Sequence, residues 1–291
     1  MKKITVVGFK DEAKLVKDVA RLVGGDVYLA ETTRYRSGEL KVTGLAKPTQ
    51  HTVVAANIWE DPDVLFRTLL LSHELRSAGT SRLDLIAPWI AYGRQDHATQ
   101  PGEEAAGIMV GRMLSAMFDR IVTLDAHSQK FIDGFKGKMR NVVPWAELKL
   151  AGKFDLVAAP DEGATSRASY AAESLGLPFI VIEKKRIHAG TKNGLPIQKI
   201  ISILPAGVKV KGARILLVDD MADTGETLKA AAVELKKAGA KNVTASVSHA
   251  FDLGKLKKGL APQIASVTAF FDHAGRKIDE KTLGALTDKV M

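Results

Sequence analysis

The sequence predicts an α/β protein made of two similar lobes, in each of which helices cover both faces of a mainly parallel sheet. Short apolar runs alternate with helix-period segments along the 291 residues. Runs that are apolar throughout are typical of strands that helices bury on both faces. The chain is also about twice the usual length of a domain, which favours two domains over one large α/β domain.

The first half of the chain carries four such runs. We expect strands at residues 4–7, 53–56, 83–87 and 121–124. Helices are expected at residues 63–78 and 103–117. A helix that connects two strands of one sheet brings them in parallel, so this half should form a parallel sheet.

The second half repeats the order. We expect strands at residues 156–159, 179–182, 215–218 and 243–247, with helices at 166–175 and 228–238. The polar segment HAGTKNGLP, 188–196, predicts a long mobile loop.

A weak internal repeat supports two related lobes. Residues 51–90 and 213–250 share the order strand, acidic turn, helix, glycine, strand. We therefore predict domains at residues 1–145 and 146–291. A chance likeness between two βαβ units is the alternative.

Composition limits the chemistry and the partners. The chain has no cysteine, which excludes disulfides, thiolate metal sites and a cysteine nucleophile, and favours a cytoplasmic protein. No run reaches the roughly 18 apolar residues of a membrane span, so we expect no membrane partner. The net charge of +9 suits anionic ligands. Basic and aromatic residues are not interleaved, so we expect no nucleic acid.

The segment DDMADTGET, residues 219–227, lies between a predicted strand and a predicted helix. The first N–H groups of a helix attract anions, so its threonine–glycine turn can hold a phosphate. Ionised Asp219 and Asp220 accept hydrogen bonds, which the vicinal hydroxyls of a ribose would donate. The segment therefore predicts a sugar-phosphate site. An acidic strand end with a threonine cap is the alternative.

The same segment resembles the 5-phosphoribosyl-diphosphate loop of the type I phosphoribosyltransferases and of the ribose-phosphate diphosphokinases. The resemblance implies two lobes of the phosphoribosyltransferase type I fold, with ATP on the N-terminal side and ribose 5-phosphate on the C-terminal side. The implied ribose 5-phosphate residues are Asp219, Asp220, Asp223, Thr224, Gly225, Glu226 and Thr227.

Further motifs resemble the diphosphokinases in particular. RYRSGEL (34–40) and AYGRQDHA (91–98) resemble their nucleotide segments. The implied ATP-binding residues are Ser37, Gly38, Glu39, Arg94, Gln95 and Asp96. TLDAHSQKF (123–131) and APDEGATSRA (159–168) resemble the segments that imply Mg²⁺ ligands at His127 and Asp161. EKKR (183–186) resembles the start of their catalytic loop, which implies catalytic roles for Lys184 and Arg186.

The residues alone leave simpler interpretations open. Arg94 and Gln95 could belong to a solvated loop, and a lone His127 is more often a hydrogen-bonded structural residue. Lys184 and Arg186 could belong to a plain basic loop.

The sequence also departs from the family's pattern. Ser37 replaces an acid in the nucleotide segment, and Ala126 replaces a leucine. Ala164 and Glu226 replace glycines of the two phosphate-binding segments.

The resemblance implies a diphosphokinase that transfers the diphosphoryl group of Mg·ATP to O1 of ribose 5-phosphate, giving 5-phosphoribosyl 1-diphosphate and AMP. It also implies a homo-oligomer, a dimer or a hexamer. Two rivals remain at this point: a phosphoribosyltransferase that consumes the diphosphate, and a catalytically silent subunit that regulates an active partner.

Overall fold

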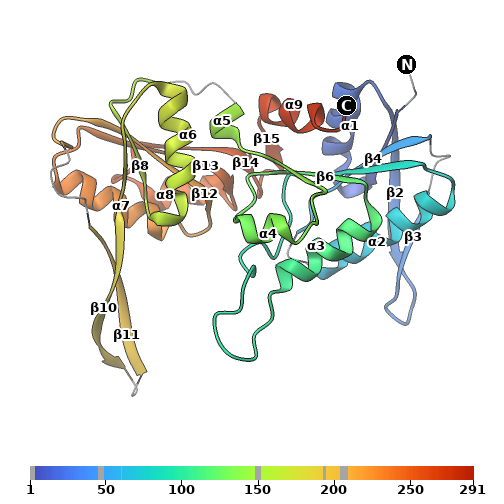
Figure 1. Cartoon of the computed structure of the whole chain (residues 1–291), viewed down its shortest axis with the longest axis horizontal. Helices are drawn as coiled ribbons and strands as arrows, with labels where there is room; N and C mark the ends of the chain where they lie inside the picture. Colours follow the sequence, from blue (N-terminus) through green and yellow to red (C-terminus); the bar gives the residue numbers. More distant parts are fainter. Residues whose placement is uncertain (1–3, 45–48, 60, 148–151, 193–194, 204–208) are drawn as a thin grey trace. The chain divides into compact units, whose positions relative to one another are not determined.

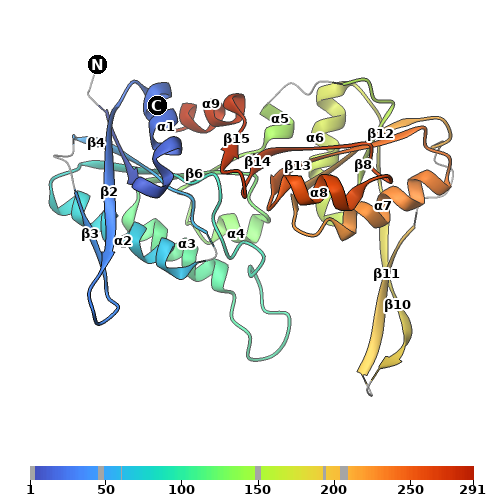
Figure 2. The same cartoon turned by 180° about the vertical axis from the view of Figure 1, so that it is seen from behind.

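The computed structural model describes residues 4–44, 49–59, 61–147, 152–192, 195–203 and 209–291; at residues 184–192 and 195–203 it describes the backbone alone. The chain divides into unit 1, Met1–Val142 with Glu280–Met291, and unit 2, Val143–Asp279. Each unit holds a mainly parallel sheet between helices, as Figures 1 and 2 show, which confirms the predicted fold class.

The end of the chain differs from the sequence-based division. The sequence assigns residues 280–291 to the second domain, whereas the structure groups them with unit 1. Helix α9 (Glu280–Asp288) packs against α1 (Ala13–Val23). Beyond the helix, Arg82 Nη2 donates a hydrogen bond to the carbonyl of Val290 at 2.7 Å. These contacts hold the C-terminal segment to unit 1.

In its described part, unit 1 contains a seven-stranded sheet in the order β3-β2-β1-β4-β5-β6-β7. Neighbouring strands are parallel except β2 and β3, which form an antiparallel pair at one edge. The strands are β1 (Ile4–Phe9), β2 (Asp26–Arg34), β3 (Leu40–Thr43), β4 (His51–Ala55), β5 (Arg82–Ile86), β6 (Arg120–Leu124) and β7 (Met139–Val142).

Helices cover both faces of this sheet. Figures 1 and 2 show α1 and α9 on one face and α2 and α3 on the other. The remaining helical elements are η1 (Lys10–Glu12), α2 (Pro62–Ser77), α3 (Ala106–Met117) and α4 (Gln129–Asp133). Helix α2 begins with a capped first turn, because the Asp61 side chain accepts a hydrogen bond from the N–H of Asp63 at 3.0 Å.

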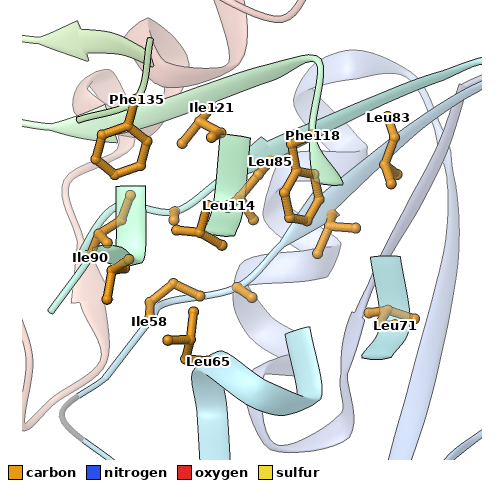
Figure 3. Close-up of a cluster of buried hydrophobic side chains, with 14 of the residues drawn as sticks. Ile58, Leu65, Leu71, Leu83, Leu85, Ile90, Leu114, Phe118, Ile121 and Phe135 are labelled. Atoms are coloured by element: carbon orange, nitrogen blue, oxygen red, sulfur yellow. The ribbon is translucent and has the colours of Figure 1, made fainter. Parts of the chain in front are cut away.

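A buried apolar cluster fastens the helices of unit 1 to the sheet (Figure 3). Its labelled members are Ile58, Leu65, Leu71, Leu83, Leu85, Ile90, Leu114, Phe118, Ile121 and Phe135. Burying one large apolar side chain contributes about 1.5–3 kcal/mol, so the cluster fixes where the strands end. The loops that follow β5 and β6 therefore start from a rigid edge.

Unit 2 contains, among its described residues, a six-stranded sheet in the order β15-β14-β13-β12-β8-β9. Its strands are parallel except for β14 and β15. They are β8 (Leu156–Ala159), β9 (Phe179–Val181), β12 (Arg214–Ala222), β13 (Asn242–Ala250), β14 (Ser266–Asp272) and β15 (Lys277–Ile278).

Two cores lie on the two faces of this sheet. One contains Trp145 and the alanines of α6, and the other contains the leucines of α7 and α8. The helical elements of unit 2 are α5 (Pro144–Glu147), η2 (Glu162–Ala164), α6 (Thr165–Leu175), α7 (Glu226–Lys237) and α8 (Leu253–Leu260).

An antiparallel hairpin, β10 (Glu183–Lys192) and β11 (Leu195–Ile203), projects from unit 2 (Figure 1). The expected loop at 188–196 is wrong in part, because strand β10 runs to Lys192 and β11 starts at Leu195. Polar composition indicated a loop, whereas pairing with the isoleucine-rich β11 makes the segment extended. Residues 193–194 of this segment lie outside the described part.

Candidate functional site

Three predicted acids of unit 2 gather at one edge of its sheet. Strands β8 and β12 are parallel neighbours, with Leu217 opposite Ala158, so their carboxyl ends lie side by side. Such edges are where open α/β sheets bind ligands. Asp161 follows β8, and Asp219 and Asp220 lie near the end of β12.

The strand containing two of these acids is longer than expected. The sequence ends it at residue 218, whereas β12 continues to Ala222, because Met221 and Ala222 still pair with β13. Asp219 and Asp220 are therefore consecutive strand residues, and their carboxyl groups are close enough to interact.

Negative charge crowds Asp219. Burial raises the pKa of its carboxyl well above the ordinary range, and the charges of Asp220 and Asp161 raise it further. One donor opposes the shift: the backbone N–H of Asp220 is 2.9 Å from Asp219 Oδ1. A cation, or hydroxyl groups that donate hydrogen bonds, would relieve this repulsion.

Arg167 on α6 contacts the same cluster. Its Nη2 is 3.7 Å from Asp220 Oδ2, and its Nη1 donates to the carbonyl of Gly163 at 3.1 Å. Both Arg167 and Asp220 are buried. Arg167 was not predicted as a site residue, and the one signal that could have indicated a role is its place in the motif 159–168.

The threonine turn joins β12 to α7. Asp223 and Thr224 are exposed, and Gly225 has a φ of 78° and caps the amino end of α7. A side chain at Gly225 would lie 3.0 Å from Leu256 Cδ2, so both the backbone and the packing require glycine. The amino end of α7 is thus a place for an anion. Glu226, which replaces a family glycine, is exposed on its first turn, and Thr227 follows it.

In unit 1, the turn that carries Arg94, Gln95 and Asp96 is fixed to the loop after β6. Asp96 accepts hydrogen bonds from Ser128 and His97. Burial alone would raise the pKa of Asp96, but these bonds and the nearby His127 outweigh it and lower the pKa. The structure therefore brings Asp96 close to His127.

Helix α4 supports this arrangement. Ser128 caps α4, accepting a hydrogen bond from the N–H of Phe131 at 3.1 Å, while its hydroxyl donates to Asp96. His127 is exposed beside this cap and can reach a ligand. Ser128 and His97 were not predicted as site residues, although both lie inside the quoted motifs.

The other nucleotide segment, RYRSGEL, forms the tip of the β2–β3 hairpin, an element apart from the Arg94 turn. Gly38 has a φ of 95°, and the hydroxyl of Ser37 donates to Glu39 Oε2 at 2.7 Å. All three tip residues, Ser37, Gly38 and Glu39, are exposed.

The predicted catalytic pair lies on β10. In the backbone register, Lys184 is opposite Ser202 and Arg186 is opposite Ile200. The side chains of Lys184 and Arg186 lie outside the described part of the structure.

Among the described residues, no group of three or more histidines and acids is arranged to hold a metal ion. Magnesium usually takes one or two carboxylates and completes its shell with waters and substrate phosphates, so a site with one or two protein ligands is consistent with magnesium.

In the part of the chain that the structure describes, no helix combines the length and apolarity that crossing a membrane requires.

Comparison with known proteins covers most of the chain. Residues 4–117 match the model for the N-terminal domain of ribose phosphate pyrophosphokinase, and residues 134–279 match that for the phosphoribosyl transferase domain. The ribose-phosphate pyrophosphokinase of Thermococcus kodakarensis is 33% identical over 81% of this chain and 82% of its own. That of Pyrococcus furiosus is 33% identical over 75% and 77%.

The fold has a solved counterpart. The structure of phosphoribosylpyrophosphate synthetase from Mycobacterium smegmatis superposes with a TM-score of 0.77 at 21% identity. The match covers 99% of this chain and 98% of that one, so both units have counterparts in that fold.

Proposed function

This chain belongs to the ribose-phosphate pyrophosphokinase family, and from that premise we propose which of its residues carry the family's reaction. The enzyme transfers the diphosphoryl group of ATP to O1 of ribose 5-phosphate, giving 5-phosphoribosyl 1-diphosphate and AMP. Such a transfer requires mainly alignment of the reactants and neutralisation of phosphate charge.

Unit 2 residues bind ribose 5-phosphate in this proposal. Asp219 and Asp220 accept hydrogen bonds from the ribose hydroxyls, and Asp223 stands beside them. The 5-phosphate is held by the turn Thr224–Thr227 at the amino end of α7. The crowding of acids around Asp219 carries the proposal, because their repulsion is relieved by a ligand rich in hydroxyl donors.

ATP is held by residues of unit 1. Arg94 and Gln95 place the phosphates, with Asp96 fixing their turn to the loop after β6. Ser37, Gly38 and Glu39 contribute from the hairpin tip.

Magnesium bound with ATP would neutralise phosphate charge, and we assign His127 and Asp161 as its protein ligands. Asp161 supports this assignment, because its charge acts on a neighbouring half-buried acid, Asp219. Lys184 and Arg186 stabilise the diphosphoryl group during transfer. We further propose a cytoplasmic homo-oligomer, a dimer or a hexamer, that binds no nucleic acid.

One assay tests the activity. Purified protein should form AMP from ATP and Mg²⁺ when ribose 5-phosphate is present and not when it is withheld. AMP formation by the purified chain contradicts a silent subunit. Consumption of 5-phosphoribosyl diphosphate with a nucleobase would instead indicate a transferase.

A second assay tests the metal assignment. His127→Ala should raise the Mg²⁺ concentration needed for half-maximal rate, because one ligand is lost. An unchanged magnesium titration would leave His127 with a structural role.

A further inference from the structure

We propose that Arg167 is a positioning residue that holds Asp220 and the turn after β8 in one arrangement, ready for ribose 5-phosphate. The proposal rests on the ribose 5-phosphate role given above to Asp219 and Asp220. It concerns a residue that would not itself contact the sugar.

The geometry of Arg167 joins two loops. One guanidinium nitrogen lies 3.7 Å from Asp220 Oδ2 on β12, and another donates at 3.1 Å to the Gly163 carbonyl after β8. A guanidinium is a rigid planar fork, so engaging two of its nitrogens fixes the distance between the groups they contact. Arg167 thereby sets the spacing between the Asp161–Gly163 turn and the acid pair of β12.

Packing of α6 brings the arginine there. Helix α6 packs against β8 and β12, and its buried face carries the small side chains of Ala168, Ala171 and Ala172. Small residues allow the helix to approach the sheet closely. Arg167 is consequently 8% exposed and Asp220 6% exposed, so their interaction is shielded from water.

The negative charge of the acid cluster explains why a cationic side chain, Arg167, is needed beside Asp220. Asp161, Asp219 and Asp220 are close enough to repel one another. Removing one partner of a buried ion pair leaves an uncompensated charge, which is far more costly than losing an exposed pair. Without Arg167, Asp220 would turn away from Asp219 and would be badly placed to accept a hydrogen bond from a ribose hydroxyl.

The test compares Arg167→Met with a matched control, Arg214→Met. Arg214 lies at the other end of β12, where it pairs with Asp155 at 2.7 Å in an exposed position. Losing the buried pair should raise the KM for ribose 5-phosphate about 10- to 100-fold, with the KM for ATP nearly unchanged. Arg214→Met should alter neither constant. Equal increases in both KM values would overturn the proposal, because general damage affects both substrates.

A double-mutant cycle separates positioning from direct contact. If Arg167 acts through Asp220, Arg167→Met combined with Asp220→Asn should bind ribose 5-phosphate no worse than Asp220→Asn alone, by calorimetry. Additive losses would contradict the proposal. Should Arg167→Met fail to fold, Arg167→Lys replaces it: this variant keeps the charge but lacks the fork, and should show an intermediate loss. Wild-type affinity in Arg167→Lys would overturn the fork's role.

The two proposals fail differently. If the wild-type protein forms no AMP, the proposed function fails whatever Arg167 does. If the wild-type protein is active and Arg167→Met binds ribose 5-phosphate normally, the positioning role alone is wrong.

Discussion

In both units, at least one acidic side chain lies at the carboxyl ends of two neighbouring parallel strands. In unit 1 an amide side chain and its backbone donate hydrogen bonds to the acid, whereas in unit 2 the neighbours of the acid are further acids. In unit 1, Glu12 lies in the turn after β1, and Asn57 after β4 donates to its Oε1 from both backbone N and Nδ2 at 3.0 Å. In unit 2, the acid after β8 is Asp161, and its neighbours on β12 are two more acids. At the ends of β1 and β4, internal amide donors satisfy the acid, whereas the ends of β8 and β12 concentrate acidic side chains.

The pKa shifts reflect this difference. Burial raises the pKa of Glu12, and hydrogen bonds from Asn57 oppose the shift. Burial also raises the pKa of Asp219, but there the charges of two acids, Asp220 and Asp161, are the next largest causes and raise it further. At Glu12 the hydrogen bonds from Asn57 come next, and the charge of Asp11 adds less. Equivalent strand ends can therefore hold a structural hydrogen-bond network in one unit and a ligand site in the other, depending on which side chains follow them.

The largest expected effect is a loss of kcat, and it should follow substitutions in the β10–β11 hairpin of unit 2 but not in the β2–β3 hairpin of unit 1. Lys184→Ala and Arg186→Ala on β10 should each lower kcat about 10²- to 10³-fold with little change in KM, because these cations act on charge that develops during transfer. The two effects should be non-additive, since both residues act on the same diphosphoryl group. AMP formation measures kcat, with the melting temperature as a check on folding.

A lysine of the other hairpin provides the control. Lys41 on β3 is exposed and lies 5.6 Å from the Tyr35 ring centroid. Lys41→Ala should leave kcat unchanged. Near-normal kcat in both single β10 variants would remove the β10–β11 hairpin from the mechanism.

The next effect tests the acid edge of unit 2. Asp219→Ala and Asp220→Ala should weaken ribose 5-phosphate far more than ATP, since a lost charged hydrogen bond is worth about 1.5–3 kcal/mol. Steady-state kinetics with each substrate varied in turn measures this. Equal losses for the two substrates would refute the placement of the ribose.

The contrast between the edges was only partly predictable. The segment DDMADTGET predicted the acids and the turn as candidate site residues. A carboxylate pair beside a phosphate-binding turn is suited to a sugar phosphate, because the carboxylates accept hydrogen bonds from hydroxyl groups. The end of β12 was missed, since pairing of Met221 and Ala222 with β13 is a long-range contact. Arg167 was missed because an arginine on a helix is usually solvated, and its burial depends on how α6 packs.

Strand β2 escaped prediction for a related reason. Much of β2 is exposed, so its residues lack the apolar run that marks the central strands. The partner strand β3 and the edge of the sheet, and not the local composition, make it extended.

A smaller effect compares two left-handed glycines. Gly225 and Gly38 have φ values of 78° and 95°, so alanine at either should cost about 1–2 kcal/mol in backbone strain. At Gly225 the new methyl group would also lie 3.0 Å from Leu256 Cδ2, whereas nothing lies within 4 Å at Gly38. Gly225→Ala should therefore destabilise the protein more in denaturant unfolding. Equal losses would show that the turn before α7 can shift.

The smallest effect concerns Glu12, the acid of unit 1 that accepts hydrogen bonds from Asn57. Because the folded-state pKa of Glu12 is raised above its ordinary 4.5, folding favours the protonated carboxyl. The stability that Glu12 contributes is thus fully present below about pH 4.5 and is lost as the pH rises through the folded-state pKa. Glu12→Gln keeps the size and an acceptor but cannot titrate. The melting temperature of the wild type relative to this variant should fall between pH 4.5 and neutrality, by an amount equivalent to about 1.4 kcal/mol for each pKa unit.

Other carboxylates titrate equally in both proteins and cancel in the difference. Ribose 5-phosphate binding should be the same in both, because Asn57 already satisfies Glu12 and Glu12 has no role in the proposed ribose site. A pH-independent difference would mean that Asn57 and Arg67 keep Glu12 ionised throughout, and unit 1 would then carry a buried charge much as unit 2 does.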